Sequence, residues 1–110
     1  MIKVKIERDK NGHIIKFYGV GHARFRKKGE DIVCASVSVL LQTARLGLKD
    51  YLHLNVEAIK RDAFLDVSIE GGDSREKADI ILETMVLGLK AIENSYPGYL
   101  KVIDSKKNGD

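Results

Sequence analysis

The stretch of sequence that decides the fold is the first one, MIKVKIERDKNGHIIKFY (residues 1–18). Its first half alternates apolar and charged side chains, which is typical of a strand with one buried face. The apolar positions of this strand are Ile2, Val4 and Ile6. Asn11-Gly12 then predicts a tight turn, because both residues tolerate positive φ at low cost. A second strand over residues 13–18, with Ile15 and Phe17 facing inward, would complete a β-hairpin.

Apolar residues spaced three and four apart predict two amphipathic helices farther along the chain. The first runs from Asp31, a suitable N-cap, to about Leu52. Its apolar stripe comprises Val33, Val37, Leu40, Leu41, Ala44 and Leu48. The second begins at Asp73, with Glu76 completing a capping box, and ends at Tyr96-Pro97-Gly98. Its stripe comprises Ala78, Ile81, Leu82, Met85, Leu89 and Ile92.

Between and after the helices, alternation predicts three more strands. Residues 55–60 and 63–70 form a pair around a turn at Arg61-Asp62, and a final strand covers residues 99–103. The inward positions of the pair are Ala63, Leu65, Val67 and Ile69. The order ββαββαβ predicts a single compact α+β domain over residues 1–104, in which a mostly antiparallel sheet packs with two long helices. Residues 105–110 form a polar tail.

The overall composition narrows the class of protein. The chain has 110 residues, 44% of them hydrophobic, and a formal net charge of +3. These values fit one folded domain, and the charge is too small to establish a nucleic-acid-binding protein. The single Cys cannot form an internal disulfide, no apolar run approaches the length that crosses a bilayer, and the alternating N-terminus is unlike a signal peptide. We therefore expect a cytoplasmic protein that does not contact a membrane.

The residues that suggest chemistry flank the start of the first helix. With Asp31 as N-cap, Cys34 lies in the first helical turn, where the helix dipole and free backbone amides can stabilise a thiolate or an oxyanion. His22 lies at the other end of the preceding loop and can supply the proton that a leaving amine requires. The spacing alone also allows a plainer interpretation, a small buried Cys and a His in a turn.

These residues resemble the signature of the ribosomal-processing cysteine proteases called Prp. The resemblance rests on GHA (residues 21–23), on DIVCASVS (residues 31–38) and on Gly29 between them. It extends over nearly the whole chain, including the opening hairpin and Tyr96-Pro97. Ser36 stands where the family usually has Ala, and both residues are small.

The resemblance implies a cysteine endopeptidase with Cys34 as nucleophile and His22 as general acid and base, and with neither a metal nor another cofactor. It implies supporting roles for Gly21, Asp31 and Ser38. Asp31 would cap the helix and orient His22, whereas Ser38 would hydrogen-bond within the site or, alternatively, to its own helix backbone. The implied substrate is the N-terminal extension of large-subunit ribosomal protein twenty-seven, which is removed in ribosome assembly.

The loop between His22 and Cys34 is basic and contains one aromatic residue. Phe25 looks exposed and is the best candidate for contact with substrate side chains. Arg24 and Arg26 could bind the substrate backbone, screen nearby ribosomal RNA or only aid solubility. The family also implies a homodimer, and three apolar residues off the main stripe of the second helix would suit a second subunit. These residues are Ile80, Val86 and Leu87.

Two other classes of function remain open. A ribosome-associated RNA-binding module would depend on the basic loop and Phe25, although the strands lack the interleaved aromatics of a sheet that reads RNA. A noncatalytic dimeric scaffold would use Cys34 only as a core residue.

Overall fold

A β-hairpin opens the chain, as the alternation predicts. In this computed structural model, which describes residues 1–27, 29–70 and 74–105, β1 (Ile2–Arg8) pairs antiparallel with β2 (Ile14–Val20). The register shifts between Glu7 and Arg8, so that Ile14 and Phe17 are both fully buried. The expectation that Ile15 faces inward is therefore wrong, because the irregularity moves the buried position to Ile14.

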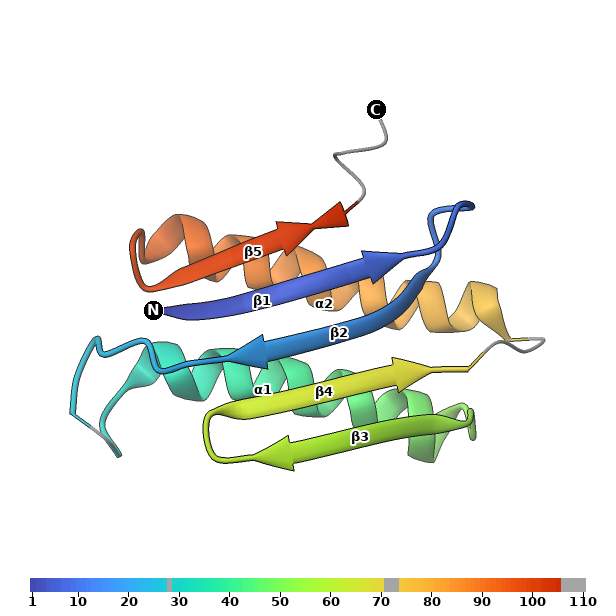
Figure 1. The fold of residues 1–110 in the computed structure, drawn as a ribbon, viewed down its shortest axis with the longest axis horizontal. Helices are drawn as coiled ribbons and strands as arrows, with labels where there is room; N and C mark the ends of the chain where they lie inside the picture. Colours follow the sequence, from blue (N-terminus) through green and yellow to red (C-terminus); the bar gives the residue numbers. More distant parts are fainter. Residues whose placement is uncertain (28, 71–73, 106–110) are drawn as a thin grey trace.

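The sheet has five strands in the order β3-β4-β2-β1-β5. β3 (Val56–Arg61) and β4 (Phe64–Ile69) form the second hairpin, and β4 pairs antiparallel with β2. β5 (Leu100–Asp104) pairs parallel with β1 at the opposite edge. Both helices lie on the same face of this sheet, and no helix of the described residues lies on the other face (Figure 1). The predicted α+β class, element order and mostly antiparallel sheet are confirmed.

The two helices differ in detail from their predicted bounds. α1 (Ile32–Leu46) continues into a π-helical segment, η1 (Gly47–Tyr51), instead of remaining α-helical to Leu52. A Cβ at Gly47 would lie 3.2 Å from the side chain of Ile81, so glycine suits the close approach of α2 (Arg75–Ser95). The predicted start of the second helix at Asp73, after Gly71 and Gly72, lies outside the described residues. The helix ends at Ser95 with Tyr96 as its C-cap, where the sequence predicts the stop.

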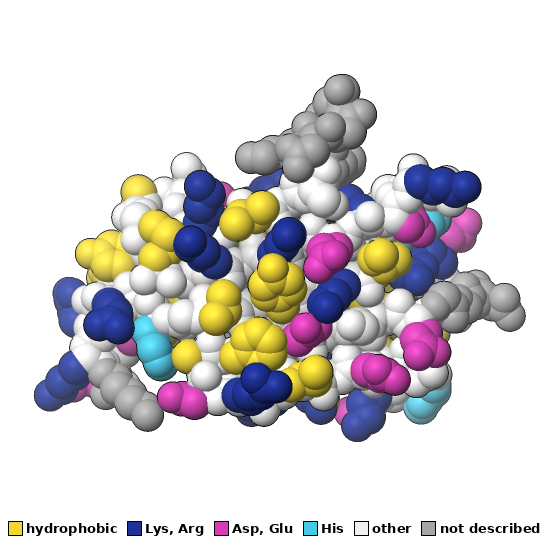
Figure 2. Space-filling view, in the orientation of Figure 1, with side chains coloured by type: hydrophobic (Ala, Val, Ile, Leu, Met, Phe, Trp, Pro, Cys, Tyr) yellow, Lys and Arg dark blue, Asp and Glu magenta, His cyan; other side chains and the backbone are white. Residues whose placement is uncertain are grey.

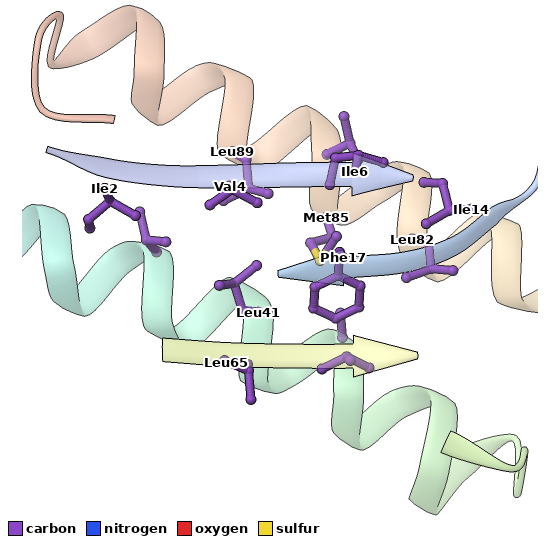
Figure 3. Close-up of a cluster of buried hydrophobic side chains, with 14 of the residues drawn as sticks. Ile2, Val4, Ile6, Ile14, Phe17, Leu41, Leu65, Leu82, Met85 and Leu89 are labelled. Atoms are coloured by element: carbon purple, nitrogen blue, oxygen red, sulfur yellow. The ribbon is translucent and has the colours of Figure 1, made fainter. Parts of the chain in front are cut away.

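The core lies between the sheet and the helices. Phe17, Leu41, Leu82 and Leu89 meet there from one strand and both helices (Figure 3). Each large apolar side chain buried in this way contributes about 1.5 to 3 kcal/mol. The expected stripes are buried except for partial exposure of Leu40, Ile81 and Ile92.

The combined helix α1–η1 is long and largely apolar. Residues Ile32–Tyr51 are 20 in number and apolar enough to cross a bilayer by length and composition alone. The expectation that no segment reaches this length is therefore wrong. One face of the helix packs into the core through Val33, Val37, Leu41 and Ala44, which accounts for its apolar character without a membrane.

Candidate active site

The start of α1 is fixed by the carboxylate of Asp31. Its Oδ1 accepts hydrogen bonds from the amides of Val33 and Cys34, each at 3.0 Å, so the predicted N-cap is confirmed. Its Oδ2 accepts from the amides of Phe25 at 2.9 Å and of Arg26 at 3.4 Å, both in the preceding loop. Desolvation raises the pKa of Asp31, but these four bonds to backbone amides outweigh it and hold the pKa below its ordinary value.

This cap changes the expected source of oxyanion donors. The amides of Val33 and Cys34 donate to Asp31 Oδ1, and the amide of Ala35 donates to the Asp31 carbonyl at 3.1 Å. These first-turn amides are therefore occupied, and the expectation that they are free to hold a thiolate or an oxyanion is wrong. The carboxylate of Asp31 also bonds to backbone amides on both sides, and within the described structure it makes no hydrogen bond to the His22 ring.

Cys34 is half buried at the mouth of this junction rather than sealed in the core. The amide of Ala23 donates to Cys34 Sγ at 3.3 Å, although Ala23 is remote from the helix start in sequence. Ala23 is itself 3% exposed, so this donor is held in place by packing. A backbone amide directed at the sulfur can donate to the thiolate, which is the form of cysteine that attacks a carbonyl.

The backbone around His22 is held by two other parts of the chain. The amide of Gly21 donates to the carbonyl of Ala63 in the β3–β4 turn at 2.9 Å, and the Met1 amino group donates to the His22 carbonyl at 2.7 Å. Gly21 has φ of +102°, and a Cβ there would lie 2.6 Å from the Met1 carbonyl oxygen. Glycine is therefore required both by conformation and by space. Ala63 also adopts positive φ, +56°, which an L-residue tolerates only at some cost.

Two hollows meet at Cys34 and share three side chains. The first has a volume of about 550 Å³ and extends from Cys34 along α1 to the β3–β4 turn. The second has a volume of about 910 Å³ and extends from Cys34 under the basic loop. The residues common to both are His22, Cys34 and Ser38. The predicted nucleophile and base thus line both hollows, which together we call the groove.

Within the described residues no hydrogen bond joins the His22 ring to Cys34 Sγ, and His22 is exposed. Catalytic hydrogen bonds are often long or unformed before substrate binds, so this geometry does not argue against the pair. Ser38 is also exposed, and no bond from it to its own helix backbone is present among the described residues. Ser36 makes that bond instead, with its Oγ donating to the Ile32 carbonyl at 2.6 Å.

The basic loop separates into two kinds of residue. Arg24 and Arg26 line the second hollow, where the sequence interpretation expects contact with a peptide backbone. Phe25 is half buried, contrary to its expected exposure. Its ring packs edge-on against Tyr96 and Tyr99, with centroid distances of 5.3 and 5.1 Å. Phe25 therefore attaches the loop to the end of α2 and the start of β5.

Sequence reasoning missed the far wall of the groove. Gln42 and the β3–β4 turn, including Arg61 and Phe64, line the first hollow. Gln42 could have been found, because it lies near one helical turn beyond Ser38 and two beyond Cys34. The turn residues carried no such signal, because only the pairing of β4 with β2 brings them to the active site.

The arrangement suits acyl transfer through a thiolate. Cleavage within a peptide chain requires a nucleophile, a general acid and base, and space for the chain on both sides. Here these are a sulfur with an amide donor, an exposed imidazole in the same groove, and the two hollows. Among the described residues no group of three metal-ligating side chains is present.

Comparison with known proteins gives the same class. The family model described as "Cysteine protease Prp" matches residues 1–101. A ribosomal processing cysteine protease Prp from Bacillus subtilis is 28% identical, with 93% of this chain and 96% of that protein covered. Its counterpart from Mycoplasma pneumoniae is 33% identical, with 84% and 90% covered.

Solved structures agree on the fold. The crystal structure of the ribosomal processing protease Prp from S. aureus with a covalently linked product peptide has a TM-score of 0.87 at 24% identity, covering 94% of this chain and 99% of that one. A second S. aureus structure, with a substrate peptide, has a TM-score of 0.82 at 24% identity over the same shares. On its sequence and its architecture, this chain belongs to the Prp family of ribosomal processing cysteine proteases.

Proposed function

We propose that this protein is a cytoplasmic endopeptidase that uses a Cys34–His22 dyad to remove the N-terminal extension of large-subunit ribosomal protein twenty-seven during ribosome assembly. The observation that carries this proposal is the shared groove, in which both side chains line the two hollows on either side of the sulfur. A groove open on both sides accepts a chain cleaved internally, because substrate must extend in both directions from the scissile bond.

The reaction begins as His22 takes the proton of the Cys34 thiol and the resulting thiolate attacks the scissile carbonyl carbon. The C–N bond then breaks as His22 gives its proton to the departing amine, leaving an acyl group on the sulfur. His22 next takes a proton from water, the resulting hydroxide attacks the thioester, and the sulfur leaves as thiolate. His22 is exposed, and the backbone beside it is held at Gly21, so its side chain rather than its backbone is free to adjust when a peptide covers the groove.

Stabilisation of the oxyanion falls to groups outside the first helical turn. The amide of Ala23 is the best placed, because it already points at the sulfur from 3.3 Å, next to where the carbonyl oxygen must lie in the tetrahedral intermediate. The Ser38 hydroxyl faces the same space and can supply a second donor. Loss of one such donor typically costs about 100-fold to 1,000-fold in kcat.

The two sides of the groove suit different parts of a substrate. Arg24, Arg26 and Lys27 make the second hollow cationic, so it favours carbonyl oxygens and polar side chains. The first hollow is lined by Val37, Leu41 and Leu65 as well as polar groups, so it can take apolar side chains. Relatives are named for ribosomal processing, and one S. aureus structure contains a substrate peptide, which supports a ribosomal protein as substrate here.

We also propose a homodimer that pairs through the outer face of the two helices. An apolar hollow of about 560 Å³ lies between α1 and α2, lined by Val39, Leu40 and Ile92. Val39, which lines it, is 62% exposed, and Ile80 and Leu87 on α2 are 69 and 70% exposed. Val86, by contrast, is 3% exposed and packs in its own core, so it does not serve as a contact. If the wild type sediments as a dimer and Leu87→Glu as a monomer, this result would support the surface as the dimer interface. A wild type that sediments as a monomer at micromolar concentration would exclude the dimer.

The direct test is incubation with the full-length ribosomal protein, followed by intact-mass measurement. The mass should fall by that of the N-terminal extension, and Cys34→Ala and His22→Ala should each abolish the change while keeping the wild-type circular dichroism spectrum. Ser36→Ala is the matched control, since Ser36 lies on the same helix but bonds only to Ile32. Cleavage by either dyad variant at the wild-type rate would refute the assignment.

A further inference from the structure

We propose that the face of the sheet without helices binds single-stranded nucleic acid, independently of peptide cleavage. The contact residues form what we call the open-face patch. It comprises Lys3, Lys5, Tyr18, Arg61, Phe64 and Lys101. These side chains come from all five strands, and only the pairing of the strands brings them together.

The register places the patch in two adjacent rows across the sheet. The partners along the first row are Lys101, Lys3, Val20, Phe64 and Arg61. The partners along the second row are Ile103, Lys5, Tyr18, Asp66 and Ile59. Neighbouring strands lie about 4.8 Å apart, so four such steps carry a row across about 19 Å of surface.

This surface is accessible. Lys3, Lys5, Lys101 and Arg61 are exposed, and Val20 between them is 40% exposed. Tyr18 and Phe64 are half buried, which leaves part of each ring open to a ligand. Figure 2 views the molecule from this side and shows hydrophobic side chains interleaved with lysines and arginines. Both helices lie behind the sheet in the same orientation (Figure 1).

The charge of the face is uneven along the strands. The first row contains three cations and no acid. In the second row Asp66 forms an ion pair with Lys16 at 3.3 Å, which neutralises it. Glu7 and Glu57 lie one row farther along, away from the active site. The positive end is therefore the one where β1 begins, beside His22.

Rings and cations together favour nucleic acid over other anionic ligands. Bases stack on aromatic rings and on guanidinium planes, while lysines bind the phosphates between them. The guanidinium carbon of Arg61 lies 5.5 Å from the centre of the Phe64 ring, so a stacking surface is already present. Tyr18 and Phe64 stand on the adjacent strands β2 and β4.

An acidic peptide could use the lysines but would gain little from the rings. The patch also continues into the groove, because Arg61 and Phe64 line the first hollow beside Cys34. A protein substrate that arrives bound to RNA could therefore be held by its RNA on the sheet and by its peptide in the groove.

The test uses the full chain carrying Cys34→Ala and a short fluorescent oligouridylate, with anisotropy measured across a salt series. The logarithm of the binding constant should fall linearly with the logarithm of the salt concentration. Lys3→Ala with Lys101→Ala should reduce the slope by about 1.4, because each phosphate contact contributes about 0.7 for a single strand. Tyr18→Leu should weaken binding by about tenfold with the slope unchanged, whereas Tyr18→Phe should keep the affinity.

The control pair is Lys49→Ala with Lys90→Ala, which removes two exposed charges from the helical side. It should leave the slope unchanged. No binding at low salt, an equal effect of the control pair, or displacement of the oligouridylate by polyglutamate of equal charge would overturn the proposal. A protein with Lys3→Ala and Lys101→Ala but with Cys34 intact should cleave the isolated extension peptide at the wild-type rate. Failure of the nucleic-acid proposal can therefore be distinguished from failure of the peptidase proposal.

Discussion

Asp31 offers a test in which the stability of the fold and the geometry of the active site can be separated. Its Oδ1 caps α1 by accepting from Val33 and Cys34, whereas its Oδ2 holds the loop by accepting from Phe25 and Arg26. Substitution by Asn keeps one acceptor oxygen and replaces the other with an amide group that can only donate. Substitution by Ala removes both. The two variants should therefore differ in a defined way.

The expected magnitudes follow from these bonds. Loss of an N-cap costs about 1 kcal/mol, and an amide left without an acceptor at a half-buried site costs about 1 kcal/mol more. Asp31→Ala should therefore lower the free energy of unfolding by about 2 kcal/mol. Asp31→Asn should stay within about 1 kcal/mol of the wild type but lose about tenfold in kcat/KM, because 1.4 kcal/mol of loop positioning corresponds to a factor of ten.

Urea unfolding and cleavage of a synthetic extension peptide would measure the two effects side by side. Glu30→Gln is the matched control, since it makes the same chemical change at the next residue, whose exposed carboxylate pairs with Lys27. An Asn variant that cleaves at the wild-type rate would refute the role of Oδ2 in loop positioning. An Asn variant as unstable as Ala would show that the two oxygens do not act separately.

Three further predictions concern the same region. Gly21→Ala should lower the free energy of unfolding by about 1 to 2 kcal/mol and lower kcat by more than tenfold. A Cβ at this position would meet the Met1 carbonyl and shift His22. Thermal unfolding measures the first effect and steady-state kinetics measure the second. Phe25→Leu should raise KM with little change in kcat, because the loop loses two ring contacts worth about 0.5 to 1.5 kcal/mol each. Phe25→Tyr keeps both ring contacts and should keep the wild-type KM. The fold lowers the pKa of Asp31, so the ionised carboxylate stabilises the folded state. This contribution to the free energy of unfolding is complete above the unfolded pKa of about 3.9 and is lost as pH falls through the lower folded pKa. Urea unfolding from about pH 5 downward should therefore show a smaller loss of stability in Asp31→Asn than in the wild type.

Much of the fold could be predicted from local pattern. The alternation in residues 1–6, the turn at Asn11-Gly12 and the two helical stripes each depend on neighbours within a few residues, and all are present. The shift at Glu7 and Arg8 could not be predicted, because it depends on how the two strands pair. The parallel placement of β5 beside β1 likewise depends on the path of the whole chain.

The site divides in the same way. The N-cap at Asp31 and the position of Cys34 in the first helical turn follow from sequence spacing. The second role of Asp31 does not, because it requires the loop to fold back over the helix start. Phe25 looked exposed because its partners, Tyr96 and Tyr99, lie far along the chain. The opposite wall of the groove comes from the β3–β4 turn, and its place beside Cys34 depends on the pairing of β4 with β2.

The position of Cys34 between two hollows has a consequence for inhibitor chemistry. An electrophile bonded to the sulfur could carry one substituent toward the β3–β4 turn and another beneath the basic loop. The two substituents would meet different surroundings, one partly aliphatic and one rich in guanidinium groups, so an anionic group belongs on the second alone. Compounds grown in a single direction would leave one of the two hollows unused.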